Sequence, residues 1–214
     1  MFDALDLVLP LACGGCGAPA TRWCDVCAAT LRVGPDQPHL ITPRHDPGVP
    51  VFALGRYAGA RRQAIVAAKE RGRADLVPPL AAALAGGIHQ LTTWGLVDTP
   101  LVVIPAPTRR SAARRRGGDP VYRIATAATR RHPAIVVQQA LRMTALARDS
   151  VGLSSGGRER NIAGRVVLTA SPCRDGDILL VDDIITTGAT ASESVRVLVS
   201  AGARVTAVLT LAHA

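Results

Sequence analysis

The segment that most constrains the fold is a run of four apolar residues followed directly by two carboxylates and a threonine-rich loop: Ile178-Leu-Leu-Val-Asp-Asp-Ile-Ile-Thr-Thr-Gly-Ala-Thr190. Uninterrupted apolar residues are typical of a strand that is buried on both faces of a parallel sheet, so residues 178–181 predict such a strand. Asp182 and Asp183 then lie at its carboxyl end. Apolar residues at helical spacing predict a helix from Thr190 onward: Ala191, Val195 and Leu198.

The loop between this strand and this helix has the composition of a phosphate site. The first turn of a helix leaves N–H groups unpaired, and these groups favour an anion. Gly188 lets the backbone approach that anion closely, and threonine hydroxyls add donors. The predicted phosphate-binding residues are Thr186, Thr187, Gly188, Ala189 and Thr190.

The two carboxylates beside this loop can accept hydrogen bonds from adjacent hydroxyls of a sugar. Ligands of open α/β sheets bind outside the carboxyl ends of the strands, where Asp182 and Asp183 are expected. A phosphate on one side and a diol on the other indicate ribose 5-phosphate. The alternative is a strand, turn and helix in which Asp183 or Thr190 only caps helix N–H groups.

Two Cys-x-x-Cys pairs stand near the N-terminus: Cys13, Cys16, Cys24 and Cys27. Four thiolates at this spacing can close tetrahedrally on Zn²⁺, and the neighbouring glycines permit the tight turn. Since four protein ligands leave no open coordination position, the predicted zinc is structural and stabilises a segment too short for a core of its own. The alternative is a disulfide or redox pair, which the doubled motif and a reducing compartment disfavour.

The rest of the chain is a proline-rich segment followed by alternating strand and helix patterns. Residues 33–50 contain five prolines and two glycines, which is typical of a linker, and His39 and His45 are expected to be solvated there. Residues 51–214 predict an α/β fold, a mostly parallel sheet flanked by helices. We therefore expect a four-cysteine zinc-finger-like segment over 1–32, a linker over 33–50 and an α/β domain over 51–214.

Positive charge is concentrated in one predicted loop. The net charge is +9, and five arginines follow the strand predicted over residues 101–104: Arg109, Arg110, Arg114, Arg115 and Arg116. A basic loop at that carboxyl end would face the crevice of Asp182 and Asp183 and could receive a pyrophosphate there. Lys69 is a further candidate for the same anion. A nucleic-acid patch and a plain solvated surface are the alternatives.

Several further motifs occur in a fixed order along the chain: the four-cysteine motif, Tyr57-Ala-Gly59, Ala68-Lys-Glu-Arg-Gly72, Pro105-Ala-Pro107, Arg116-Gly117 and Arg158-Glu-Arg-Asn161. The segment from Leu179 to Thr190 resembles the phosphoribosyl-pyrophosphate signature of type I phosphoribosyltransferases. Taken in order, the motifs resemble the ComF family, and the resemblance covers nearly the whole chain. One departure is that Gly118-Asp119-Pro120 follows where the family commonly continues Phe-Asn-Gln, which leaves the acceptor open.

The resemblance implies a type I phosphoribosyltransferase fold with an N-terminal zinc finger, binding phosphoribosyl pyrophosphate together with Mg²⁺. Asp182 and Asp183 would bind the ribose 2- and 3-hydroxyls, and residues 186–190 the 5-phosphate. It also implies a role in DNA uptake during natural competence, with single-stranded DNA and the DNA-uptake helicase machinery as partners. Transfer of the phosphoribosyl group stays open, and the alternative is a non-catalytic nucleic-acid-binding or adaptor protein that keeps the pocket as a sensor or relic.

The sequence predicts no membrane segment. It contains no run of 18 apolar residues. Residues 1–11 are apolar, but Asp3 and Asp6 interrupt them and they lack a basic n-region, so we expect no signal peptide. The expected location is the cytoplasm.

Overall fold

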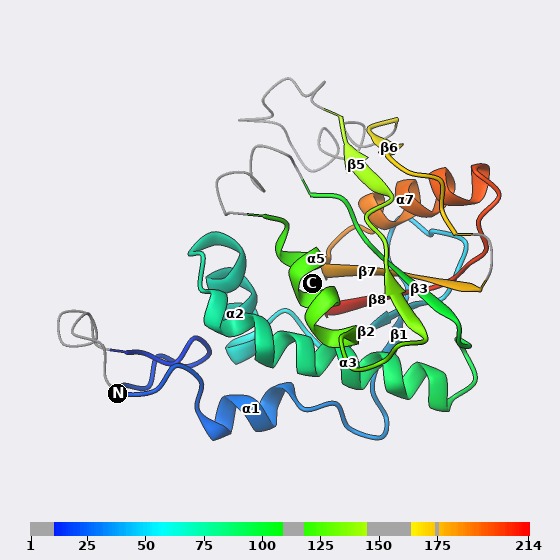
Figure 1. The fold of residues 1–214 in the computed structure, drawn as a ribbon. Helices are drawn as coiled ribbons and strands as arrows, with labels where there is room; N and C mark the ends of the chain where they lie inside the picture. Colours follow the sequence, from blue (N-terminus) through cyan, green and yellow to red (C-terminus); the bar gives the residue numbers. More distant parts are fainter. Residues whose placement is uncertain (1–10, 109–117, 145–163, 174–175) are drawn as a thin grey trace.

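The structure is a computed structural model that describes residues 11–108, 118–144, 164–173 and 176–214 (Figure 1). Its elements in chain order are α1 (Asp25–Leu31), β1 (His39–Ile41), β2 (Val51–Ala53), α2 (Gly59–Glu70), the 3₁₀ turn η2 (Ala74–Leu76), α3 (Val77–Thr93), β3 (Leu101–Pro105), α5 (Pro120–Thr129), β4 (Ile135–Val137), β5 (Leu141–Met143), β6 (Val166–Leu168), β7 (Asp177–Ile185), α7 (Ala189–Ser200) and β8 (Val205–His213).

Six of the strands form one sheet in the order β1-β2-β8-β7-β3-β4. All neighbours in it are parallel except β1 and β2, which are antiparallel. Strands β5 and β6 pair separately as an antiparallel ribbon. The predicted α/β fold class, a mostly parallel sheet flanked by helices, is confirmed.

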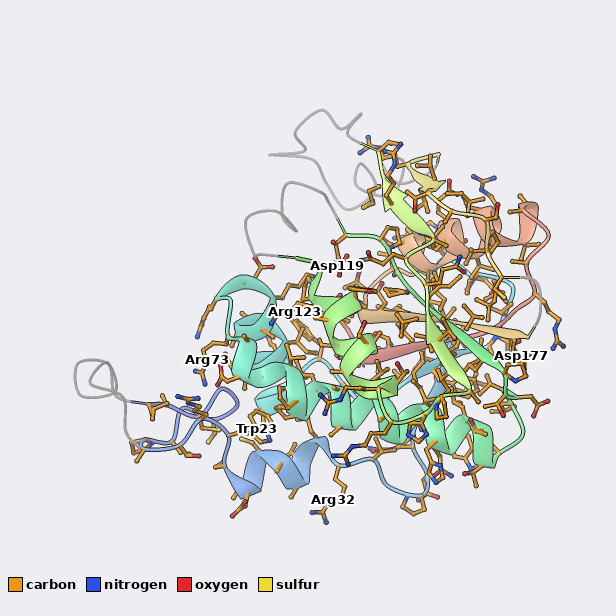
Figure 2. All side chains as sticks on the ribbon, viewed as in Figure 1. Trp23, Arg32, Arg73, Asp119, Arg123 and Asp177 are labelled. Carbon is orange, nitrogen blue, oxygen red and sulfur yellow. The ribbon has the colours of Figure 1, made fainter. Side chains whose placement is uncertain are left out.

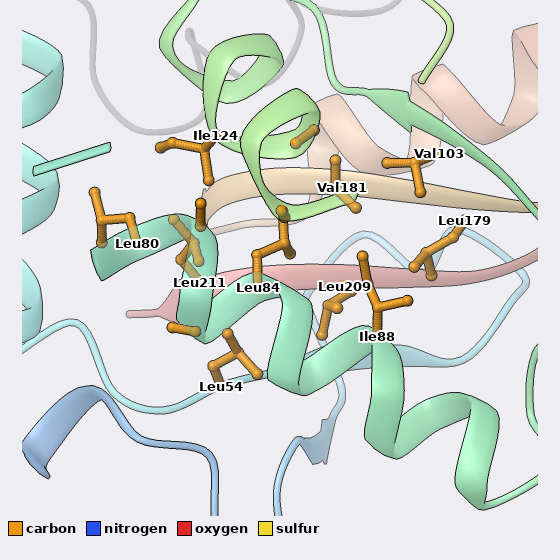
Figure 3. Packing of buried hydrophobic residues seen from close by; sticks show 14 of the residues in the cluster. Leu54, Leu80, Leu84, Ile88, Val103, Ile124, Leu179, Val181, Leu209 and Leu211 are labelled. Carbon is orange, nitrogen blue, oxygen red and sulfur yellow. The ribbon is translucent and has the colours of Figure 1, made fainter. Parts of the chain in front are cut away.

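Helices cover both faces of the sheet because the central strands are apolar on both sides. Leu179 and Val181 of β7 belong to the core under α3 and α5, whereas Leu180 belongs to the core under α7. Figure 3 shows Leu84 and Ile88 of α3 against the sheet residues of the first core. This double burial is what the apolar run predicts, and it places β7 in the middle of the sheet, between β8 and β3.

Strand β7 is longer than the sequence predicts. Its pairing with β3 ends at Val181, but its pairing with β8 continues to Ile185. The long partner strand β8 therefore keeps Asp182 and Asp183 in strand conformation, whereas the sequence pattern ends the strand before them. Both carboxylates lie on the part of β7 that projects past β3, at the carboxyl edge of the sheet.

The proline-rich segment is not only a linker, because it contains the edge strand β1. Register pairs His39 with Ala53 and Ile41 with Val51. Ile41 and Val49 also pack against the core under α7. His39 is exposed as expected, but His45 is half-buried. The division of the chain at residues 32 and 50 stays a prediction.

Candidate functional site

The carboxylates of β7 have different surroundings. Side chains alternate along a strand, so Asp183 faces the α2 side of the sheet together with Val181, and Asp182 faces the α7 side. Asp183 is 5% exposed. Its Oδ2 lies 2.5 Å from Nζ of Lys69, in the last turn of α2. Asp182 is half-buried, and its Oδ1 accepts a hydrogen bond from the Asp183 N–H at 2.8 Å.

The environment of Asp182 disfavours its charged form. Burial raises the pKa of this carboxyl well above its usual range, the neighbouring Asp183 carboxylate raises it further, and the Lys69 ammonium partly opposes both. A strongly perturbed carboxyl at the carboxyl edge of a parallel sheet is typical of a functional site. A ligand that brings hydroxyl donors or a cation would favour the charged form.

Asparagine in place of Asp182 should stabilise the ligand-free protein at neutral pH. The pKa of Asp182 is higher in the folded than in the unfolded chain, so stability falls as pH rises above the unfolded pKa, about 3.9. Asp182→Asn removes this cost, and we expect the Tm at pH 7 to rise by about 2 °C or more. Thermal unfolding at pH 7 and at pH 3 measures this. An equal rise in Tm at both pH values would contradict a destabilising charge on Asp182, because the carboxyl is already protonated and neutral at pH 3.

The predicted phosphate loop joins β7 to α7. The helix begins at Ala189, and its N-cap is Gly188, which has φ 83° and ψ −1° and no side chain to cap the first turn. Thr187 Oγ1 accepts a long hydrogen bond, 3.4 Å, from the Ala189 N–H. Thr186 is exposed. The alternative in which Asp183 or Thr190 caps the helix does not describe this turn, since Gly188 is the N-cap and Asp183 pairs with Lys69.

The loop with the arginine cluster begins and ends beside the same edge of the sheet. Arg109, Arg110, Arg114, Arg115 and Arg116 lie outside the described residues. Just before them, Ala106 donates its N–H to the Val181 carbonyl at 2.7 Å. Thr108 Oγ1 donates to Asp119 Oδ2 at 2.7 Å and so joins the two ends of the loop. Asp119 also caps α5 by accepting from the Val121 N–H, a role that the sequence indicates by Pro120 at the first helical position (Figure 2).

The four predicted metal ligands come together in space. The Sγ atoms of Cys13, Cys16, Cys24 and Cys27 all lie within 4.8 Å of one another. Tetrahedral coordination of zinc places sulfur atoms about 3.8 Å apart, so a small closure of this cluster gives a tetrathiolate site. Close packing enforces the turn, because a Cβ on Gly15 would lie 2.5 Å from the Cys27 sulfur.

The electrostatics of the cluster suit a thiolate site. Burial opposes ionisation of Cys13, but N–H groups of Cys16, Cys24 and Gly15 point at its sulfur and lower its pKa to about 6. Burial raises the pKa of Cys27, and the neighbouring thiols raise it further. Several thiolates can therefore coexist only with a cation among them, and the cluster could hold a metal such as zinc.

The cysteine segment, residues 11–32, packs on the α/β part of the chain through η2 and the residue before it, and its helix α1 also contacts α2 and α3. A Cβ on Gly14 would lie 2.5 Å from Cδ1 of Leu76, which is fully buried. Arg73 donates to the carbonyls of Ala12 at 3.1 Å and Arg22 at 3.3 Å, and Asp75 fixes the same guanidinium at 2.6 Å (Figure 2). Sequence patterns give no signal for these contacts.

Replacing Arg73 with alanine should loosen the cysteine segment. The change removes two hydrogen bonds to the segment, whose loss we expect to cost about 1–3 kcal/mol locally. Metal transfer to a chromogenic chelator should become about tenfold faster. Arg71→Ala is the matched control, since it removes the same charge from an exposed position nearby. Equal transfer rates in the two variants would argue against this role of Arg73.

Comparisons with known proteins add little to this geometry. A scan against protein-family models finds no match, and neither does a search of curated proteins. Among solved structures that match is a hypoxanthine phosphoribosyltransferase from Staphylococcus aureus, with 19% sequence identity and a TM-score of 0.36. The match covers 64% of this chain and 62% of that chain, less than two thirds of either. At this TM-score the fold class of the chain rests on its own sheet topology.

Within the described residues, no helix combines the length and the apolar composition needed to cross a membrane.

Proposed function

We propose that the chain is a ComF-like protein with a type I phosphoribosyltransferase domain that binds phosphoribosyl pyrophosphate with Mg²⁺. The observation that supports this most is the placement of two carboxylates and a glycine-capped helix start at one carboxyl edge of a parallel sheet. Asp182 and Asp183 would accept hydrogen bonds from the ribose hydroxyls, and residues 186–190 would donate to the 5-phosphate. Zinc, held by the four cysteines, is the structural metal of this proposal.

The proposed reaction transfers the phosphoribosyl group to a nitrogen nucleophile. The bond between the anomeric carbon and the pyrophosphate oxygen breaks, the nitrogen forms a bond to that carbon, and the nitrogen loses a proton to solvent or a base. The carboxylates would orient the ribose while positive charge develops on it. When bound, Mg²⁺ would neutralise part of the negative charge of the pyrophosphate. The carboxylate oxygens of Asp182 and Asp183 are hard ligands, the kind that Mg²⁺ prefers.

Lys69 has a defined place in this proposal. Its ammonium lies against Asp183 and therefore next to the proposed ribose position, where it can attract the pyrophosphate while keeping one carboxylate neutralised. The arginines of residues 109–116 would bind the leaving pyrophosphate, because their loop starts beside Val181. Lys69 and the arginines of residues 109–116 together provide the positive charge that the pyrophosphate requires.

Pyrophosphate release with a panel of free nucleobases tests the transfer step. The proposal expects release in the presence of phosphoribosyl pyrophosphate, Mg²⁺ and one acceptor, and none with the Asp182→Asn, Asp183→Asn double variant. Binding without release for every acceptor would favour the non-catalytic alternative, in which the pocket is a ligand sensor of an adaptor protein in DNA uptake.

One observation favours nucleic-acid binding as a second function. A groove of about 610 Å³ lies beside the cysteine segment. Its other side is formed by α2 and by Arg71 and Arg73, which follow that helix. Among the described residues that line it are Arg62, Arg71 and Arg73, and none of these lining residues carries a carboxylate. A helix of 12 residues is about 18 Å long, enough to lie beside an extended polyanion.

Fluorescence titration of a labelled single-stranded oligonucleotide at two salt concentrations tests this second function. Arg62→Ala with Arg71→Ala should weaken binding by about tenfold and flatten its salt dependence, because two phosphate contacts are removed. Affinity for phosphoribosyl pyrophosphate should not change, since none of the residues that line the groove belongs to β7 or to residues 186–190. An oligonucleotide affinity that stays the same after the Arg62→Ala and Arg71→Ala substitutions would contradict nucleic-acid binding in this groove.

A further inference from the structure

A short piece of the proline-rich segment lies against the predicted phosphate loop. We call residues 43–46 the support segment. The His45 N–H donates to the Thr187 carbonyl at 2.8 Å. Ser192, in the first turn of α7, donates its hydroxyl to the Asp46 carbonyl at 3.2 Å. The support segment therefore contacts both the loop and the helix that follows it.

The contact with Gly188 is equally close. A Cβ added to Gly188 would lie 2.6 Å from the His45 carbonyl oxygen and 2.6 Å from Cβ of Pro43. Gly188 also has φ 83°, a conformation that favours glycine. Glycine is thus needed here for two reasons, the backbone conformation and the close approach of the support segment.

The hydrogen bond from His45 sets the direction of a donor in the loop. The Thr187 carbonyl and the Gly188 N–H belong to one planar trans peptide, so they point in opposite directions. Since the carbonyl points at His45, the Gly188 N–H points away from the support segment. No oxygen of the residues that the structure describes accepts this N–H, which leaves it for a ligand.

The support segment has a fixed shape of its own. Asp46 Oδ1 accepts a hydrogen bond from the Gly48 N–H at 2.8 Å, and Gly48 has φ 76°. Ile41 before the segment and Val49 after it pack against the core under α7. The segment is thus attached at both ends to the same core that contains α7.

We propose that the support segment positions the phosphate loop, so that the His45 backbone N–H aims the Gly188 N–H at the 5-phosphate of the ligand. This inference rests on the proposed function of the same site. The His45 N–H is a positioning group, because it acts through the Thr187 peptide and does not touch the ligand. The side chain of His45 is not required for this role.

A pair of substitutions at one position separates the backbone from the side chain. His45→Pro removes the N–H, whereas His45→Ala keeps it. Calorimetric titration with ribose 5-phosphate and with phosphoribosyl pyrophosphate should show affinities about tenfold lower in His45→Pro than in His45→Ala, by the same factor for both probes because they share the 5-phosphate. His45→Ala should bind like the wild type.

A second variant keeps the inference testable if His45→Pro does not fold. Ser192→Ala removes a second hydrogen bond to the support segment and should weaken the binding of both probes about threefold, whereas Ser200→Ala, at the exposed end of α7, should change nothing. Equal affinities in folded His45→Pro and His45→Ala, or in Ser192→Ala and Ser200→Ala, would overturn this inference alone. Wild-type protein that binds neither probe would overturn the proposed function with it.

Discussion

Replacing Asp182 and Asp183 together with asparagine should lower the affinity for phosphoribosyl pyrophosphate with Mg²⁺ by about 100-fold or more. Each carboxylate is expected to accept a charge-assisted hydrogen bond from a ribose hydroxyl, and such bonds contribute about 1.5–3 kcal/mol each. The neutral amides also lose their attraction for the Mg²⁺ that accompanies the ligand. Calorimetric titration measures the change.

The fold should survive this double substitution. The pKa of Asp182 is raised, so its charge is unfavourable in the folded protein, and asparagine keeps the acceptor for the Asp183 N–H. Lys69 loses its ion pair with Asp183, but its side chain is 28% exposed and can be solvated. Far-UV circular dichroism and a thermal midpoint near that of the wild type are the expected controls.

Asp177→Asn is the matched control for this experiment. Asp177 is a buried carboxylate at the opposite end of the same strand, where it accepts from the Asp98 N–H at 2.8 Å and pairs with Arg204 (Figure 2). Its replacement should lower stability and leave ligand affinity unchanged. If the double variant at Asp182 and Asp183 binds as tightly as Asp177→Asn, the pocket assignment is wrong.

Replacing Cys13 and Cys27 with serine should abolish metal binding and unfold the cysteine segment. These two cysteines are the buried members of the cluster, 4% and 1% exposed, and serine is a poor ligand for zinc. Structural zinc contributes about 10–16 kcal/mol to the folding of small zinc fingers, so a segment without it should open. We expect the Tm of the whole chain to fall by about 5–10 °C, because Leu76 and Arg73 lose their contacts with the segment.

Metal analysis and limited proteolysis measure this effect. Wild-type protein should carry stoichiometric zinc, and the double cysteine variant should carry none and be cut within residues 11–32. Cys173→Ser is the control, since this exposed cysteine lies outside the cluster and should not change the zinc content. Wild-type protein purified without metal, yet resistant to protease in that segment, would contradict the structural role of zinc.

The central strand and the four-cysteine cluster were predictable because their signals are short sequence patterns. Four consecutive apolar residues require burial on both faces, and the structure buries Leu179 and Leu180 completely. The Cys-x-x-Cys spacing likewise fixes which sulfur atoms can meet. In both cases the pattern that carries the signal lies within a short stretch of sequence.

The contacts of the candidate site were not predictable, because they join distant parts of the chain. Lys69 was a candidate for an anion, but its pairing with Asp183 depends on how α2 crosses the sheet. His45 lies in a stretch whose prolines indicate a solvated linker, yet it contacts Thr187. The extension of β7 through two carboxylates contradicts its local pattern and follows from pairing with the long strand β8.

Calorimetric titration of the wild-type chain with phosphoribosyl pyrophosphate, with and without Mg²⁺, tests the proposed ligand most directly. We expect saturable binding that strengthens with Mg²⁺ and is about 100-fold weaker or more in the Asp182→Asn, Asp183→Asn variant. Absence of binding by the folded, zinc-loaded wild-type protein would contradict this expectation and leave the carboxylates and phosphate loop of β7 without the proposed ligand.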